Sequence, residues 1–392
     1  MSFFRIALIT LLILILLLGC REDNTVQPEE STYVYNIPEN LNDGWTTGSL
    51  QEVGMNTATI TEMIEFFNDF PNSGIHGLLI IKNNKLVLEE YFRGYKYVAE
   101  NVPSESDIIE FGPDTLHYLA DVSKIIIPLL FGIAREDGFV FDLDDYVKDY
   151  FQEYSVLFNN GKENIRLQDM MSMTSGIEWE ENLFEYGYEQ NDIQLLLRSD
   201  DPFKFFLEKD LTSIPGSNFN YNSGTTLILS EILNRITGTE IDQYADLKLF
   251  QPLEINKVKW DLTNHNNANT SAGLYLTLRD LAKLGQLFAV NGSWNGRSIL
   301  SQEWINLSKA PLVDLNYYYF SDGYSIHMWN YSFETNQNIY ECLFWAGWGE
   351  QYLFVIPELQ LVFAVIGGNY YDLIEFSMHT IVEKYILNAV QN

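Results

Sequence analysis

The sequence predicts an α+β (mixed α/β) fold, in which an antiparallel sheet is flanked by terminal helices and joined to an all-helical lobe. Strand-like segments with tight turns occur near both ends of the chain, at about 77–92 and 351–366. The stretch between them, from about residue 115 to 310, is mostly helical in its hydrophobic pattern. Because 46% of the 392 residues are hydrophobic, the chain can bury a large core, and disorder is excluded for most of it.

Each sheet segment reads as a hairpin. Residues 77–81 and 86–92 are apolar runs separated by the turn sequence Lys-Asn-Asn-Lys. Residues 351–356 and 361–366 form a second such pair across a Pro-Glu turn. From Asp372 onward, apolar side chains recur at helical spacing, which predicts an amphipathic terminal helix that covers one face of the sheet.

The first residues have the pattern of a secretion signal. Ile6 to Leu18 is an apolar run of 13 residues, whereas a helix needs about 20 to cross the hydrocarbon core. The run ends in Leu-Leu-Gly before Cys20, which resembles a bacterial lipobox, so we expect lipidation of Cys20. An ordinary signal peptide that happens to contain a cysteine is the alternative. Residues 1–19 are therefore a predicted lipoprotein signal peptide and 20–45 a polar tether. The expected location is the bacterial cell envelope, lipid-anchored on its periplasmic or surface side.

Charge and composition exclude several function classes. Lys and Arg number 23 against 54 Asp and Glu, a net charge of -31, which disfavours nucleic acid as a partner. The two cysteines rule out a disulfide framework. The five histidines are scattered and show no HExxH spacing, so we expect no metal and no cofactor.

Five segments carry the candidate chemistry. They are residues 117–145, 167–179, 215–224, 272–285 and 346–352. The first contains His-Tyr-Leu-Ala-Asp-Val-Ser-Lys, the second Met-Thr-Ser-Gly, the third Tyr-Asn-Ser-Gly and the last Ala-Gly-Trp-Gly-Glu-Gln-Tyr. In this order they resemble the serine β-lactamase-related superfamily, which includes class C β-lactamases, D,D-peptidases, family VIII esterases and 6-aminohexanoate-oligomer hydrolases.

The resemblance implies a β-lactamase/transpeptidase-like domain over residues 46–392. Its sheet lobe would comprise about 46–115 and 310–392, its helical lobe about 116–309, with a cleft between the lobes. The implied ligand is a small peptide-, amide- or ester-like molecule in that cleft. The oligomeric state is left open.

The catalytic Ser-x-x-Lys motif is altered in this chain. Lys124 occupies the lysine position, and the residue three before it is Asp121 instead of the nucleophilic serine. We interpret Asp121 as a helix N-cap that pairs with Lys124. This pairing would keep the lysine protonated, and it would place a carboxylate where an acyl oxyanion must bind. Ser123 is a poor substitute because adjacent helical residues point about 100° apart. Pro128 lies a few residues further on. It is expected either to kink the helix or to distort it harmlessly, and the sequence favours neither outcome.

The resemblance assigns three further positions. Tyr221 matches the tyrosine that assists proton transfer in the family. Alignment on Gly347 places Trp345 where a cationic residue usually stands, which makes carboxylate-bearing, penicillin-like substrates less favourable. The oxyanion donors would be the backbone N–H groups of Asp121 and Trp348.

Aromatic residues at 317–320, 324 and 329 suggest a carbohydrate platform, although aromatics at such positions more often pack in a core or rim. Three functions therefore remain: a catalytically impaired or inactive envelope lipoprotein that binds a ligand in its cleft, an active hydrolase with altered nucleophile chemistry at Asp121 or a water with Tyr221, and a non-enzymatic surface scaffold. We favour the first, because the serine is missing.

Overall fold

The computed structural model describes residues 33–70, 74–98, 107–181, 190–318, 320–335, 338–370 and 376–391. The predicted signal peptide and Cys20 lie outside these residues. The larger compact unit begins at Tyr35, whose hydroxyl donates to the Val87 carbonyl at 2.9 Å. The chain therefore joins the folded unit ten residues before the predicted end of the tether at residue 45.

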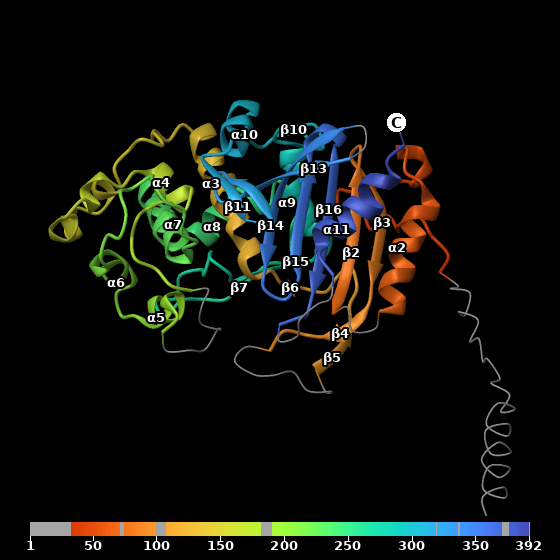
Figure 1. Ribbon diagram of the computed structural model, residues 1–392, viewed down its shortest axis with the longest axis horizontal. Coiled ribbons are helices and arrows are strands. Elements are labelled where there is room, and N and C mark those ends of the chain that lie inside the picture. The colour runs from red at the N-terminus through yellow and green to blue at the C-terminus, as the bar shows by residue number, and fades with distance from the viewer. Residues whose placement is uncertain are drawn as a thin grey trace, which may run out of the picture. The chain divides into compact units, whose positions relative to one another are not determined.

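One large sheet forms the frame of this unit (Figure 1). In the described residues its strand order is β1-β3-β2-β16-β15-β14-β13-β12-β11, with β1 parallel to β3 and every other pair antiparallel. The strands are β1 (Thr46–Thr47), β2 (Ile75–Lys82), β3 (Lys85–Tyr91), β11 (Val313–Tyr318), β12 (Ser321–Tyr324), β13 (Trp329–Glu334), β14 (Ile339–Gly347), β15 (Gln351–Ile356) and β16 (Leu361–Gly367).

Both predicted hairpins are confirmed. β2 and β3 pair around Asn83 and Asn84, which both adopt positive φ, the conformation that a two-residue hairpin turn requires and that asparagine tolerates. Because β2 also pairs with β16, the two ends of the chain meet at the centre of one sheet. Smaller pairings join β4 (Arg93–Tyr95) to β5 (Ile108–Glu110), β9 (Ser293–Trp294) to β10 (Arg297–Ser298), and β6 (His117–Tyr118) through β8 (Leu274–Leu276) to β7 (Lys259–Trp260).

Helices cover both faces of the sheet. On one face, His379 of the terminal helix packs its ring against Phe344 of β14 at 4.9 Å. On the other, Phe288 lies 5.2 Å from Trp345, the next residue of the same strand, because successive strand residues point to opposite faces. The helices that cover the two faces are α2 (Thr57–Asp69), α9 (Leu278–Ala289), α11 (Met378–Ile381) and its π-helical continuation η9 (Val382–Leu387).

The remaining helices build the second lobe and its loops. They are α3 (Ile126–Glu136), α4 (Leu167–Met171), α5 (Asp192–Arg198), α6 (Pro202–Glu208), α7 (Ser223–Thr237), α8 (Ile241–Ala245), η7 (Asp246–Phe250) and α10 (Gln302–Lys309), with the short helices η3 (Ala120–Ile125), η4 (Val147–Tyr150), η5 (Gln152–Leu157) and η6 (Lys162–Asn164). Two further short helices belong to the sheet lobe: η1 (Gln51–Val53), between β1 and α2, and η8 (Pro357–Leu359), between β15 and β16. α9 contacts β2, β15 and β16, so this part of the segment 116–309 packs on the sheet and does not belong to the helical lobe.

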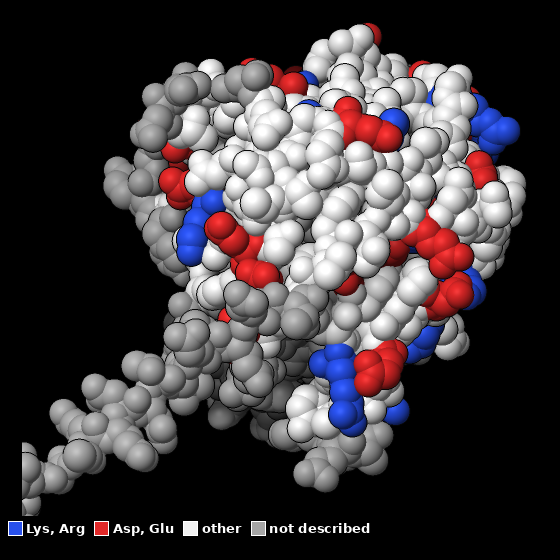
Figure 2. Space-filling view, turned by 90° about the vertical axis from the view of Figure 1, so that its right-hand side faces the viewer, with Lys and Arg blue, Asp and Glu red and all other residues white. Residues whose placement is uncertain are grey.

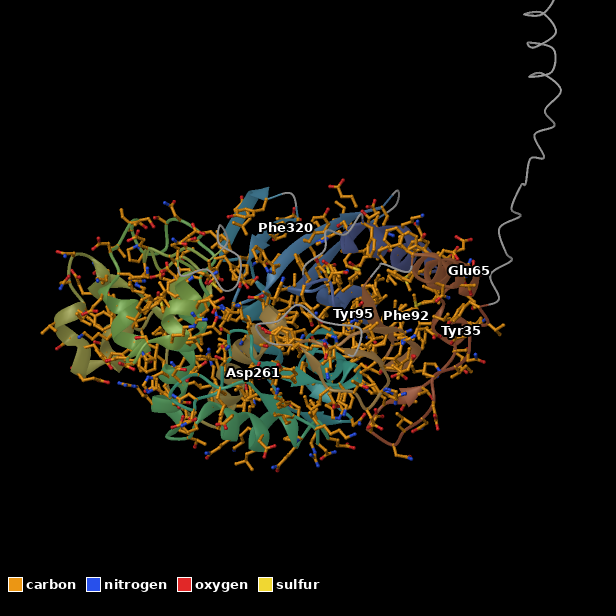
Figure 3. The ribbon with its side chains drawn as sticks, turned by 90° about the horizontal axis from the view of Figure 1, so that it is seen from below. Tyr35, Glu65, Phe92, Tyr95, Asp261 and Phe320 are labelled. Atoms are coloured by element: carbon orange, nitrogen blue, oxygen red, sulfur yellow. The ribbon has the colours of Figure 1, made fainter. Side chains whose placement is uncertain are left out.

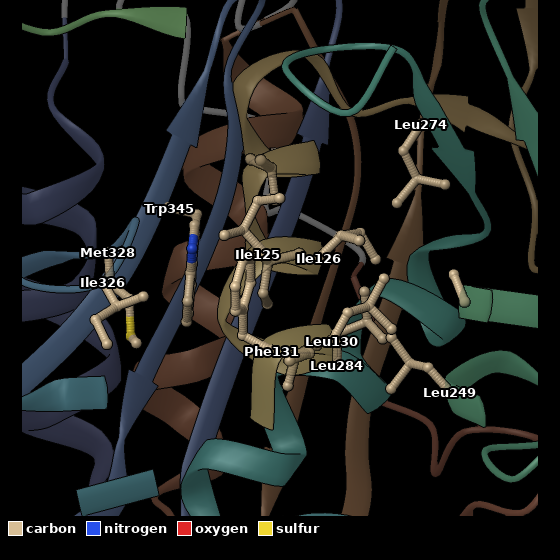
Figure 4. Packing of buried hydrophobic residues seen from close by; sticks show 14 of the residues in the cluster. Ile125, Ile126, Leu130, Phe131, Leu249, Leu274, Leu284, Ile326, Met328 and Trp345 are labelled. Atoms are coloured by element: carbon tan, nitrogen blue, oxygen red, sulfur yellow. The ribbon is translucent and has the colours of Figure 1, made fainter. Parts of the chain in front are cut away.

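The segment that leads into the site differs from the expected single helix. Asp121 is not an N-cap: residues 120–125 form the 3-10 helix η3, its N-cap is Leu119, and α3 begins only at Ile126. Pro128 therefore lies in the first turn of α3, where its missing N–H costs no helical hydrogen bond. Its carbonyl accepts from the indole N–H of Trp304 at 2.7 Å, which ties α3 to α10. Around α3 the core is continuous between the two lobes (Figure 4).

Surface charges contribute little to this architecture. On the face shown in Figure 2, lysine and arginine side chains occur in small groups close to acidic ones. A representative exposed pair is Lys85 with Glu52, 3.0 Å apart. Such pairs contribute at most about 1 kcal/mol each, so the stability of the domain rests on its core.

Two buried histidines connect the central strand to the segment before η3. Nδ1 of His76 on β2 lies 2.9 Å from Nε2 of His117, and Nδ1 of His117 bonds to the Tyr118 carbonyl at 2.9 Å. Because a carbonyl only accepts, His117 carries its proton on Nδ1, and its Nε2 accepts from His76. Burial lowers the pKa of His76 to about 2 and that of His117 to about 4, so both rings are neutral.

We predict that this pair makes the domain sensitive to acid. The unfolded histidines bind protons near their ordinary pKa of about 6.5, whereas the folded ones do not until near pH 4 or below, so folding free energy is lost as the pH falls below about 6.5. From about pH 7.5 to about pH 5, urea unfolding should show the wild type losing about 2 kcal/mol more free energy of unfolding than His117→Gln. His265→Gln, at an exposed position, is the matched control; equal slopes for the wild type and His117→Gln would contradict the prediction.

Candidate active site

A cavity of about 550 Å³ lies between the sheet and the helical lobe. Its described lining comes from four places: η3, the ends of β11, β13 and β14 with the residues next to them, the loop before α7, and α5 with the loop before it. The lining residues are Asp121, Glu181, Ile193, Phe219, Tyr221, Tyr318, Phe320, Trp329, Ala346, Gly347 and Trp348. The first, third and fifth sequence segments thus meet at one cavity.

The 3-10 geometry of η3 aligns Asp121 with Lys124. With three residues per turn, side chains at i and i+3 lie directly above one another. The Lys124 Nζ is 2.6 Å from the Asp121 Oδ1, which confirms the predicted pairing. Ala120, just before the pair, has a φ of 47°, a left-handed conformation that costs a non-glycine residue about 1–3 kcal/mol.

Lys124 is almost completely enclosed. Its side chain is 2% exposed, against 19% for Asp121, so a molecule in the cavity meets the carboxylate and not the ammonium. The second hydrogen bond of Nζ goes to the Ser271 carbonyl at 2.8 Å. Ser123 is fully buried, and its Oγ accepts from the Leu274 amide at 3.1 Å. The structure thus gives Ser123 a structural bond away from the cavity, as its position next to Lys124 predicted.

Tyr221 completes the group around Asp121. Its hydroxyl donates to Asp121 Oδ1 at 3.2 Å, and the Lys124 ammonium lies 5.0 Å from the centre of its ring. Burial, and then the negative charge of Asp121, raise the pKa of Tyr221 well above its ordinary value. The phenol is therefore a neutral donor, and no phenolate is available there to accept a proton.

Glu181 is a functional candidate that the sequence reading missed. Its Oε1 accepts from the Ser223 hydroxyl at 2.8 Å, and its Oε2 accepts from the Ser223 amide at 2.9 Å and the Trp179 indole at 2.5 Å. Burial raises the pKa of this carboxyl, an effect that the nearby Lys124 charge opposes. Ser223 holds the third position of the tyrosine motif, so Glu181 introduces a second carboxylate at that motif. Only its place two residues after the Trp179 that ends the second segment could have drawn attention to it.

The third motif lies against η3 through its backbone. A Cβ on Gly347 would lie 2.8 Å from the Leu119 carbonyl and 3.0 Å from the Asp121 amide nitrogen, so glycine is required for this close approach. Gly347 and Trp348 both line the cavity. Gln351 fixes the turn that follows, because its Nε2 donates to the Gly349 and Gly367 carbonyls at 3.0 and 2.6 Å.

Trp345 is the assigned position that the structure separates from the site. Its side chain points from β14 into the core beside Ile125 and Phe131 (Figure 4), and it is not among the residues that line the cavity. Strand alternation is the reason, because Trp345 faces α9. The cavity therefore receives neither a cation nor an indole from this position.

The aromatic residues near 320 line the cavity rather than only packing behind it. We call Phe219, Tyr318, Phe320 and Trp329 the aromatic wall. The Phe219 ring lies 5.7 Å from that of Tyr318 and 5.6 Å from that of Trp329, and Trp329 stacks on Tyr221 at 5.7 Å. Figure 3 places Phe320 on the side of the sheet that faces the helical lobe.

Comparison with known proteins agrees with this geometry. The family model for beta-lactamases matches residues 64–367, which is more than half of the chain. The chain belongs to the beta-lactamase family.

Three proteins similar to this chain share 17–26% of its residues over the matched regions. Protein flp of Staphylococcus aureus (strain MW2) is 23% identical over 199 residues, 51% of this chain and 37% of flp. The 6-aminohexanoate-dimer hydrolase of Paenarthrobacter ureafaciens is 26% identical over 207 residues, 50% of this chain and 51% of that protein. These matches thus span only about a third to a half of the relatives. A penicillin-binding protein homologue from Caulobacter crescentus superposes with a TM-score of 0.64 at 17% identity, covering 85% of this chain and 97% of the other. That likeness shows the shared fold.

Within the described ranges, no group of three or more His, Cys, Asp or Glu side chains is arranged to hold a metal ion.

We predict an asymmetric loss of stability when the ion pair is broken. Asp121→Ala leaves an enclosed ammonium without its partner and should cost roughly 3 kcal/mol or more. Lys124→Met leaves a carboxylate that water can reach, so its loss should be smaller. Chemical unfolding of both variants measures the difference, with Glu341→Ala on the exposed side of β14 as the control. A larger loss for Lys124→Met would show that the pair is not organised around a buried lysine.

Proposed function

We propose that this beta-lactamase-family protein has no serine acyl-transfer activity and binds a small peptide-, amide- or ester-like ligand in its cleft. The observation that carries the proposal is the Asp121–Lys124 ion pair at the nucleophile position. In the family's chemistry the lysine must help remove a proton from a serine hydroxyl. Here the ammonium is occupied by a carboxylate and a carbonyl, and the nucleophile position holds no hydroxyl.

The electrostatics support the same conclusion. The resemblance assigns the oxyanion donors to the backbone N–H groups of Asp121 and Trp348, and both residues line the cavity. Their neighbour, however, is a carboxylate, and two negative charges about 4 Å apart repel by about 4 kcal/mol at an effective dielectric constant of 20. The full penalty would slow formation of a tetrahedral oxyanion by about a thousandfold. Because the Lys124 ammonium offsets part of the Asp121 charge, the slowing should be smaller than that.

Hydrolysis by altered chemistry is the second candidate, and Glu181 is the observation that favours it. A carboxyl with a raised pKa in a cavity can act as a general base toward water. Against this, both Glu181 oxygens already accept hydrogen bonds, and Asp121 Oδ1 accepts two. A scaffold role without cleft binding is the third candidate, and no particular contact in the structure favours it.

We also propose that the protein is a lipid-anchored envelope protein, on the basis of Cys20 and the apolar run before it. Among the residues that the structure describes, no helix is both long and apolar enough to cross a membrane. Mass spectrometry of the detergent-extracted protein should find a diacylglyceryl group on Cys20. Cys20→Ser should move the protein from the membrane to the soluble fraction, and an unmodified, membrane-associated Cys20 would contradict the anchor.

The proposal on acylation is tested with active-site probes. A fluorescent penicillin and a fluorophosphonate should both leave the wild-type protein unlabelled, because the motif lacks a hydroxyl. Asp121→Ser restores the hydroxyl and frees Lys124, so the fluorophosphonate should label it at least about tenfold faster than the matched Asp121→Ala variant.

An adduct on any serine of the wild-type protein would overturn the proposal. Steady hydrolysis of a p-nitrophenyl ester by the wild type is the further test. If it disappears in Glu181→Gln or Asp121→Asn, the altered hydrolase becomes the correct function.

A further inference from the structure

The charge of the cavity lining is negative. Asp121 and Glu181 both line it, whereas no lysine, arginine or histidine occurs among the described lining residues. The nearest cation, Lys124, lies behind Asp121 and is ten times less exposed. Its charge offsets that of Asp121, so the cavity presents net negative charge to a ligand when Glu181 is ionised.

The rest of the lining is largely aromatic. The aromatic wall, together with Tyr221 and Trp348, surrounds the carboxylates with ring surfaces. Ring faces carry partial negative charge and attract cations, by about 0.5–2 kcal/mol per contact depending on desolvation. The chain already uses this arrangement internally, because the Lys124 ammonium sits 2.6 Å from a carboxylate oxygen and 5.0 Å from the centre of the Tyr221 ring.

The protein as a whole acts in the same direction. A net charge of -31 lowers the local concentration of anions and raises that of cations near the protein. A carboxylate ligand would have to overcome this field, then approach Asp121, and would find no cation from the Trp345 position, since that side chain is in the core.

We propose that the cleft selects organic ammonium ligands: an amine carried on an apolar or aromatic body, with the ammonium near Asp121 and Glu181 and the body against the aromatic wall. This inference rests on the proposed function in taking the cleft as the ligand site. It is independent of whether any catalysis occurs, because charge selection and acylation have separate measurements.

Three probes of equal length and different charge test the proposal: 4-phenylbutylamine, 4-phenylbutanol and 4-phenylbutyrate. Binding to the mature full-length protein is measured by calorimetry and by NMR of the probes. The amine should bind about tenfold or more tightly than the alcohol, the butyrate should bind weakest, and added salt should weaken the amine alone.

Variants locate the binding. Glu181→Gln should reduce amine affinity about tenfold while changing alcohol affinity little, and Trp329→Leu should weaken the amine and the alcohol together. Glu341→Gln, on the exposed side of β14, is the matched carboxylate control and should bind like the wild type. Glu181 is chosen so that the test does not depend on the folding of Asp121 variants.

Equal or tighter binding of the butyrate, an amine affinity unchanged in Glu181→Gln and Trp329→Leu, or no binding of any probe would each overturn the inference. Its failure is distinguishable from failure of the proposed function. A wild-type acyl adduct would refute the loss of acyl transfer while leaving charge selection intact. Weak amine binding without any adduct would refute charge selection while leaving the loss of acyl transfer intact.

Discussion

The 2.6 Å contact between Asp121 and Lys124 determines what the site can do. An ammonium enclosed to this degree is strongly destabilising unless a negative partner and hydrogen bonds compensate it. Asp121 supplies the charge, and the Ser271 carbonyl and the Tyr221 ring supply the remaining contacts. With a neutral serine at position 121 the same lysine would be under-compensated, which is the condition that lets a lysine act as a base. On the proposed function, the aspartate stabilises the buried lysine and removes its reactivity at the same position.

Close backbone approaches hold the scaffold around this pair. Gly347 leaves no room for a side chain beside η3, Gln351 holds the turn after the third motif, and Ala120 keeps its strained backbone next to Asp121. These features require support from the surrounding sheet and from the η3–α3 segment. Strain of this kind persists only where the neighbouring structure fixes it. The fold is therefore that of the beta-lactamase family, and the Asp121–Lys124 ion pair lies within it.

Local sequence patterns explain why the hairpins and the altered catalytic motif could be predicted. The hairpins around Asn83 and at 357 follow from short-range alternation and turn chemistry, and the altered motif follows from a spacing of three residues. Glu181 could not be found in this way, because its partner Ser223 is 42 residues away and comes near only through the fold. Trp345 was misplaced because alignment gives the strand position but not the face, and the face depends on where α9 packs. The prediction that Asp121 is a helix N-cap was wrong because residues 120–125 form a 3-10 helix before the α-helix begins.

The second carboxylate makes the charge reversal more than a local substitution. If Asp121 alone had replaced a serine, Lys124 would neutralise it, and the cavity would be close to electrically neutral. Among the described residues no cation forms an ion pair with Glu181, and its hydrogen bonds come from the neutral groups of Ser223 and Trp179. Burial opposes its ionisation and the Lys124 charge favours it, so its charge state couples to the ion pair across the cavity. A bound ammonium would add a second positive charge beside Glu181 and favour its ionised form. Ligand binding and the charge of Glu181 should therefore reinforce one another, and this linkage gives the cleft a physical reason to prefer cations.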